Sequence, residues 1–351
     1  MGDGQLRARL DALAGVGGAV SAIELAVVAG DQVVLRHAAG WRGAGERLEP
    51  GARFDAASLT KPWTATLALV LDAAGALPLA TEIGALFPAC ADALARRTLE
   101  DLLRHRAGLV AWTPIAVRLG RRLGVREALE RLLTEGELLA ADVGPGTYSD
   151  LGYLLWGLAA ERATGESLAD LLDRRVASPL GLAPIGALAA EPPHAVECRL
   201  DNGREVELAR GQGFDIERRA LRLDGRPQDG NARMLARLCG HAGLFVRLDE
   251  QLALAQEWRM PGRLLDRGQV AAALAGGTGW ALGWARASAD GSGGPAWSAA
   301  AFGHAGFTGG ALWIDPERDR IVATLAHRLD SRADFNPVRR ELHRLAFEPG
   351  S

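Results

Sequence analysis

The sequence has almost no lysine. Of its 40 basic side chains only Lys61 is a lysine, and all the others are arginine. Arginine stays protonated at any accessible pH, whereas a partly desolvated lysine can lose its proton and act as a base. Lys61 follows Ser58 by three positions. We therefore interpret the only lysine as a candidate proton acceptor for that serine.

Cysteines and long apolar runs are also scarce. Cys90, Cys198 and Cys239 lie far apart and form no Cys-x-x-Cys pair, which favours reduced thiols over a disulfide framework. No apolar run approaches transmembrane length. Residues 1–13 are polar and amphipathic, and no secretory signal is evident. We therefore expect a cytoplasmic protein that does not bind a membrane.

Charge and histidine spacing argue against two further classes, nucleic-acid-binding proteins and metalloproteins. The net charge is −3, and the arginines are scattered among 43 acidic residues, which argues against a nucleic-acid partner. The seven histidines show no His-Glu-x-x-His or comparable ligand spacing. We therefore expect neither a metal site nor a cofactor.

Strand-forming runs lie near both ends of the chain. Residues 23–28 and 32–38 flank Gly30 and Asp31 and predict a hairpin. Near the other end, three more runs predict strands, with a turn at 315–319 between the last two: 279–287, 302–314 and 320–326. Asn336 as N-cap and Pro337 as first helical residue predict a terminal helix.

The middle of the chain is helical in character. Thr98 and Asp101 resemble a capping box, and 151–164 is apolar at helical spacing and ends at Gly165. We therefore predict an α+β fold with an antiparallel sheet formed from both chain ends, flanked by terminal helices, and an all-helical insertion. The expected organisation is one unit, 1–351, with a sheet region at 1–57 and 246–351 and a mainly helical region at 58–245.

Ser58 and Lys61 have helical spacing. If a helix begins at Ser58, both side chains face the same side. The backbone N–H of a serine at a helix N-terminus also points to where an oxyanion would develop. The alternative is that Ser58 only caps the helix and Lys61 is a solvated side chain.

Both tyrosines of the chain, Tyr148 and Tyr153, fall within residues 145–153. A phenol near a lysine amine can share its proton and relay it between nucleophile and leaving group. The alternative is a turn followed by a helix, with Asp150 as N-cap and Tyr148 as surface packing.

A glycine-rich strand is predicted at 302–310. Glycines within a strand mark a close approach of another backbone or a ligand, and the N–H of Phe307 is the most plausible second donor to an oxyanion. His304 lies in this segment. The tetrapeptide Gly-His-Ala-Gly also occurs at 240–243, so only the hairpin that follows the later copy distinguishes it.

The order Ser-x-x-Lys, Tyr-x-Asp, His-x-Gly strongly resembles the serine β-lactamase and penicillin-binding protein superfamily. The class C-like branch, with family VIII carboxylesterases and D-aminopeptidases, is the closer match. The resemblance covers about residues 20–330 and includes three further segments: 105–109, 151–182 and 231–245.

By this resemblance the fold is β-lactamase/transpeptidase-like, and Ser58 forms an acyl-enzyme. Lys61 and Tyr148 would take and return the proton. The backbone N–H groups of Ser58 and Phe307 would form the oxyanion hole. The partner would be a small-molecule acyl ester or amide, and no cofactor is implied.

The candidate substrate-binding residues are His304, Ala305, Gly306, Asp150 and Trp112. Trp112 follows closely after residues 105–109 and could line the acyl site, as could Trp63 or Trp297; the alternative is that these tryptophans belong to the core.

Two positions depart from the usual family pattern. Asp150 replaces an asparagine, and a carboxylate near Lys61 would favour the charged amine. We expect Asp150 to point away as a helix cap; the alternative is that it serves a positively charged substrate. His304 and Ala305 offer neither the lysine nor the hydroxyl that hold a substrate carboxylate, which favours an ester or a neutral amide.

Three functions stay open. The first is an esterase acting on a small acyl ester. The second is an amide hydrolase of the β-lactamase, D-aminopeptidase or D,D-peptidase kind, or an acyltransferase. The third is a non-catalytic binding protein of the same fold, against which the intact Ser58, Lys61 and Tyr148 argue.

Overall fold

The centre of the protein is a seven-stranded antiparallel sheet. The computed structural model describes residues 2–119, 130, 131, 133, 134, 138, 146–186, 195–235, 237–276 and 279–348. The strand order is β3-β2-β1-β9-β8-β7-β6. The strands are β1 (Val20–Ala29), β2 (Gln32–Gly43), β3 (Glu46–Arg47), β6 (Ala285–Arg286), β7 (Phe302–Ala305), β8 (Gly309–Asp315) and β9 (Arg320–Arg328). Because β1 pairs with β9, the two ends of the chain close one sheet.

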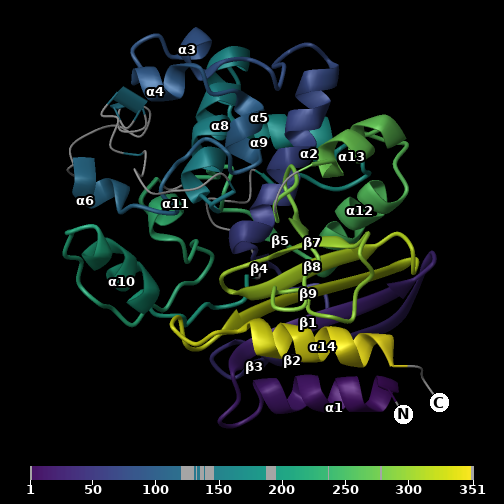
Figure 1. Cartoon of the computed structure of the whole chain (residues 1–351). Coiled ribbons are helices and arrows are strands. Elements are labelled where there is room, and N and C mark those ends of the chain that lie inside the picture. Colours follow the sequence, from purple (N-terminus) through teal and green to yellow (C-terminus); the bar gives the residue numbers. More distant parts are fainter. Residues whose placement is uncertain are drawn as a thin grey trace.

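Two terminal helices cover one face of this sheet (Figure 1). They are α1 (Gly2–Ala14) and α14 (Asn336–Phe347). Leu6, Leu10 and Leu13 recur at helical spacing along α1 and are buried against the sheet. On α14, Leu342 and Leu345 are buried in the same hydrophobic cluster. The terminal helices that the sequence predicts are therefore present.

Most of the other helices lie on the opposite face, whereas the helix at Gly203–Gly211 lies beside the sheet (Figure 1). No described helix is long and apolar enough to cross a membrane. The fold is α+β with a large antiparallel sheet, which confirms the prediction. The helices are α2 (Thr60–Ala73), α3 (Ile83–Leu86), α4 (Asp92–Ala95), α5 (Leu99–Leu103), α6 (Ile115–Leu119), α8 (Asp150–Thr164), α9 (Leu168–Leu172), α10 (Gly203–Gly211), α11 (Gly230–Leu235), α12 (Leu248–Arg259) and α13 (Arg267–Leu274).

The central strands are buried on both faces. On β1, Ile23 and Leu25 pack toward α1 and α14, whereas Ala22 and Ala26 pack toward the helical layer. Side chains alternate between the faces of a strand, so two apolar layers require a continuous apolar run. This requirement explains why the strand-forming runs of the sequence show no polar alternation.

Two predicted strands are shorter than expected. The run 302–314 is divided into β7 and β8 by a turn, in which Gly306 N–H donates to Gly310 O at 2.8 Å. Of the run 279–287, only the two residues of β6 form a strand. Gly279 and Gly283 have φ angles of +92° and +84°, in the left-handed region that interrupts an extended strand.

The predicted helix signals were mostly confirmed. Thr98 and Asp101 form the expected capping box of α5, and Gly165 ends α8 with a φ of +74°. The prediction that Asn336 is an N-cap was wrong, because Phe335 is the N-cap of α14 and Asn336 is its first residue.

A buried ion pair fixes the segment that leads to Ser58. Strand β4 (Phe54–Asp55) pairs with β5 (Phe245–Val246) just before the serine. Both Nη atoms of Arg53 donate to the carboxylate of Glu250 on α12, at 2.9 and 2.8 Å. The two side chains are only 4% and 7% exposed. This bidentate pair connects the entry to α2 with α12.

We predict that Glu250→Ala lowers the free energy of unfolding by about 3–5 kcal/mol, because it leaves the Arg53 guanidinium buried and unpaired. Thermal or urea unfolding measures the loss. Glu207→Ala is the control: it removes a pair with Arg204 whose side chains are 47% and 50% exposed. It should change the stability by less than about 0.5 kcal/mol. Equal effects of the two substitutions would contradict the assignment.

Candidate functional site

Ser58 lies in a short 3-10 turn, Ala57–Leu59, directly before α2. The turn borders a cleft of about 630 Å³. Ala57 has a φ of +45°, which is unfavourable for a residue with a Cβ. The buried Asp55 supports this conformation by accepting the Ala57 N–H at 2.9 Å and the Gln228 N–H at 2.6 Å. Burial raises the pKa of Asp55 to about 6.

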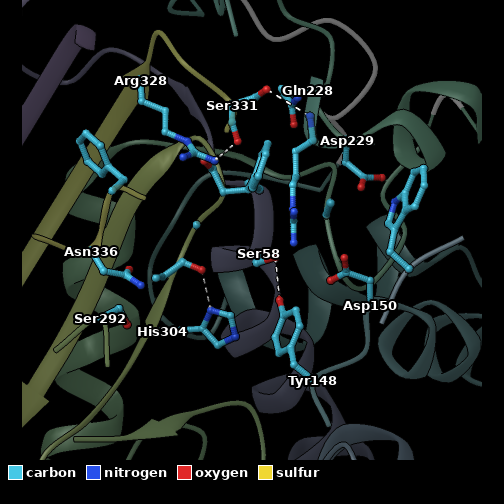
Figure 2. A pocket seen from close by; sticks show the side chains of 18 of the residues that line it. Ser58, Tyr148, Asp150, Gln228, Asp229, Ser292, His304, Arg328, Ser331 and Asn336 are labelled. Atoms are coloured by element: carbon cyan, nitrogen blue, oxygen red, sulfur yellow. Dashed lines mark hydrogen bonds between the residues drawn. The ribbon is translucent and has the colours of Figure 1, made fainter. Parts of the chain in front are cut away.

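Two proton-carrying side chains contact the serine hydroxyl. Lys61 Nζ and Tyr148 Oη each lie 2.9 Å from Ser58 Oγ. Figure 2 shows Tyr148 reaching the serine from the segment before α8. The structure therefore brings together the three residues that the sequence predicts as the reactive group.

Lys61 is fully buried, with an exposed fraction of 0%. Its Nζ donates to Asp150 Oδ1 at 2.6 Å and to the His241 carbonyl oxygen at 3.4 Å. Burial lowers the pKa of Lys61, and the Asp150 carboxylate opposes this effect without fully offsetting it. The amine therefore loses its proton more readily than an ordinary lysine.

The prediction that Asp150 points away as a helix cap was wrong. Ser149 is the extended N-cap residue, and Asp150 is the first residue of α8. The Ser149 hydroxyl donates to Val110 O at 2.7 Å, so its hydroxyl proton is directed away from the helix. Because α8 begins one residue earlier than expected, the Asp150 carboxylate faces Lys61.

Tyr148 stays protonated. Burial and the nearby Asp150 carboxylate raise the pKa of Tyr148 well above its ordinary value. Its ring packs against both His105 and Trp280, with centroid distances of 4.7 and 4.9 Å. The phenol is thus held as a hydrogen-bond donor to Ser58.

His304, Ala305 and Gly306 line the same cleft (Figure 2). His304 Nδ1 lies 3.0 Å from Ala305 O, so it carries the proton and donates to that carbonyl. Its Nε2 is buried and finds no partner among the described residues. Burial and then Lys61 lower the pKa of His304 to about 3. The imidazole is therefore neutral and presents a free acceptor.

Two backbone N–H groups border the cleft without a partner. These belong to Ser58 and Phe307, and no residue that the structure describes accepts a hydrogen bond from either. The β7–β8 turn lies close to the serine turn: a Cβ added to Gly306 would be 2.8 Å from Ala56 O. Free N–H groups beside a nucleophile suit a developing oxyanion.

The tryptophans divide between cleft and core. Trp112 lines the cleft, as expected. Trp63 and Trp297 do not; each is buried in a hydrophobic cluster. Trp280 lines the cleft and was missed because its segment was predicted to be a strand.

A second carboxylate cluster was also missed. His241 Nε2 lies 3.0 Å from Asp229 Oδ1, and both residues line the cleft near Lys61. Burial opposes the charge of Asp229, but His241 holds its pKa down to about 2. Burial raises the pKa of the neighbouring Glu205 to about 7. The repeated Gly-His-Ala-Gly tetrapeptide was the available signal. Within the described ranges no group of three or more His, Cys, Asp or Glu could hold a metal ion.

The sequence is similar to that of known proteins. A model of the family "Beta-lactamase" matches residues 6–346. Esterase EstB of Burkholderia gladioli is 29% identical over 74% of this chain and 73% of its own. Penicillin-binding protein 4 of Amycolatopsis lactamdurans is 30% identical over 86% and 79%.

A solved structure shows the same fold. EstCE1, described as a hydrolase with promiscuous acyltransferase activity, has a TM-score of 0.74 at 20% identity, and the match covers 97% of this chain and 99% of EstCE1. The family match over nearly the whole chain shows that the protein belongs to the beta-lactamase family.

Proposed function

We propose that the protein is a serine hydrolase that acts through an acyl-enzyme on Ser58, most favourably as an esterase on a small acyl ester. One observation carries this proposal: Ser58 Oγ lies between an amine and a phenol, 2.9 Å from each, at the edge of an open cleft. A nucleophile with a proton acceptor at hydrogen-bond distance is the arrangement that covalent catalysis needs.

The proposed acylation moves one proton and exchanges one acyl bond. Neutral Lys61 takes the Ser58 proton, and Oγ attacks the substrate carbonyl carbon. The Ser58 and Phe307 N–H groups hold the resulting oxyanion, where one donor is worth about 10²–10³ in rate. The carbon–oxygen bond of the leaving group then breaks, and that oxygen receives the proton through Tyr148 and Lys61.

Deacylation repeats these steps with water. The Lys61–Tyr148 pair removes a proton from water, the hydroxide adds to the acyl carbon, and Ser58 leaves with a returned proton. The free acid is released, and the site returns to its starting protonation state. No metal or organic cofactor enters either half-reaction.

The neutral imidazole of His304 itself supports an ester over a β-lactam. The family's usual cation at this place would hold a substrate carboxylate, but a neutral imidazole with a free acceptor lacks that attraction. We propose that Trp112, Ala305 and Gly306 also contact the substrate and that Asp150 tunes Lys61. The similarity to esterase EstB supports this choice.

The second candidate is an amide hydrolase or acyltransferase. Similarity to penicillin-binding protein 4 supports amide chemistry, and EstCE1 supports acyl transfer. A binding protein without turnover is the weaker alternative, since Ser58, Lys61 and Tyr148 all keep reactive geometry. The buried, free cysteines support our expectation of a reducing cytoplasmic compartment.

We predict that a fluorophosphonate adds one covalent adduct to the wild type and none to Ser58→Ala, as measured by intact mass. The substitution removes the only attacking oxygen. The same two proteins are then tested with p-nitrophenyl acetate and a chromogenic cephalosporin. We expect ester turnover without cephalosporin turnover in the wild type.

Two results would contradict this proposal. A wild type without adduct or turnover would leave only the binding protein. An adduct that persists in Ser58→Ala would place the nucleophile elsewhere.

We further predict that Asp150→Asn shifts the acidic limb of the kcat/KM profile to lower pH. Activity requires neutral Lys61, so it rises as pH passes upward through the Lys61 pKa. The Asp150 carboxylate raises that pKa, and removing its charge lowers it. The control is Asp215→Asn, whose side chain is 87% exposed. A limb that stays in place or moves upward would show that the ion pair does not set the activity.

A further inference from the structure

Two buried arginines hold the turn that presents the Phe307 N–H. Arg328 on β9 donates from Nε to Phe307 O at 2.7 Å. Arg339 on α14 donates from Nη2 to Gly306 O at 2.5 Å. Both residues line the cleft and are less than 10% exposed, at 6% and 8%. In Figure 2, Arg328 and Asn336 lie on one side of Ser58, opposite Asp150.

The hydrogen bond from Arg339 to the Gly306 carbonyl oxygen acts on the same peptide group as the Phe307 N–H. The Gly306 carbonyl and the Phe307 N–H belong to the same planar, resonance-stabilised peptide unit. A cation that binds the carbonyl oxygen withdraws electron density from the nitrogen. Hydrogen bonds in such a chain polarise one another, so the N–H becomes a stronger donor.

Neither cation forms an ion pair. Within the described part of the chain, neither Arg328 nor Arg339 has an acidic group within ion-pair distance, and the Asp334 carboxylate acts on both only from further away. Arg339 Nη1 instead donates to the neutral Asn336 Oδ1 at 2.9 Å, and Arg328 donates to the Ser331 and Ala333 carbonyls. A buried cation without a counter-ion is costly for stability.

The charge state of Arg339 is secure at neutral pH. Burial, followed by the neighbouring Arg328 cation, lowers the pKa of Arg339 to about 9. The side chain therefore remains protonated under ordinary conditions, and its positive charge is directed at the Gly306 oxygen.

We propose that Arg339 is a positioning residue of the oxyanion hole, which orients and polarises the Gly306–Phe307 peptide so that the Phe307 N–H binds a developing oxyanion more strongly. This inference rests on the proposed acyl-enzyme function. The substrate carbonyl is neutral in the ground state and anionic in the transition state. Arg339 therefore acts on kcat more than on KM.

The experiment measures kcat and KM with p-nitrophenyl acetate, a neutral substrate. Arg339→Met should lower kcat by about 10- to 100-fold at nearly unchanged KM, a smaller loss than the about 10²–10³ for removing a whole oxyanion donor, because the Phe307 N–H itself remains. Arg339→Lys keeps the charge and should fall between Met and wild type. Arg340→Met is the matched control, because Arg340 Nη1 binds the Asp290 carbonyl at 2.9 Å and lies outside the cleft lining. It should behave like wild type.

A second variant separates electrostatics from packing. Asn336→Asp keeps the Arg339 guanidinium but places a carboxylate beside it. An acidic residue in the first turn of α14 also favours the helix, so the protein should fold at least as well. We expect kcat to fall because the carboxylate offsets the cation. Because Asn336 also lines the cleft, the same substitution is made in Arg339→Met: a loss through Arg339 disappears in that background, whereas direct repulsion of the oxyanion by the new carboxylate persists and would contradict the inference.

Each remaining outcome is decisive. If kcat of Arg339→Met and of Asn336→Asp stays within twofold of wild type, the inference is overturned while the proposed function stands. A rise in KM at unchanged kcat would assign Arg339 to substrate binding and also overturn it. A wild type that neither hydrolyses the ester nor reacts with a fluorophosphonate overturns the proposed function and this inference together. If Arg339→Met does not fold, Asn336→Asp and Arg339→Lys decide.

Discussion

The site depends on the burial of one ammonium group. Lys61 is enclosed by Ser58, the Asp150 carboxylate and the His241 carbonyl oxygen, and it has no exposed surface. Burial disfavours the charged amine and the ion pair favours it, so a balance of two large opposing terms sets its proton affinity. Burial prevails here and lowers the pKa of Lys61. We propose that the neutral amine accepts the proton of the serine.

The fold brings together, around Lys61 and Ser58, residues that lie far apart in the sequence. Helix α2 carries the amine, the segment before α8 brings the phenol, and the first residue of α8 brings the carboxylate. The β7–β8 turn brings a free N–H group. The sheet that supports this turn is closed by both chain ends. Arg339 on α14 donates a hydrogen bond to the Gly306 carbonyl of the turn. The Arg328 cation and the Asp150 carboxylate lie on opposite sides of Ser58 (Figure 2).

The sequence was sufficient where the signal was local. Strand-forming runs at both chain ends around a helical middle predicted the α+β sheet, and motif order predicted that Ser58, Lys61 and Tyr148 would meet. The orientation of Asp150 was mispredicted because a shift of one residue in the helix start redirects the side chain. The place of Trp280 in the cleft was not predicted, because its segment was expected to be a strand. Glycines with positive φ angles interrupt that strand. Arg339 contacts a carbonyl 33 residues away, a relation that no short spacing reveals.

The most direct test uses the scarcity of lysine itself. Because Lys61 is the only lysine, protein labelled with carbon-13 lysine gives one side-chain Cε signal, and its shift against pH reports the Lys61 pKa without assignment. We predict a single titration with a midpoint below that of an ordinary lysine, and a still lower midpoint in Asp150→Asn. A midpoint at or above the ordinary value would show that the ion pair outweighs burial and that Lys61 is not the base.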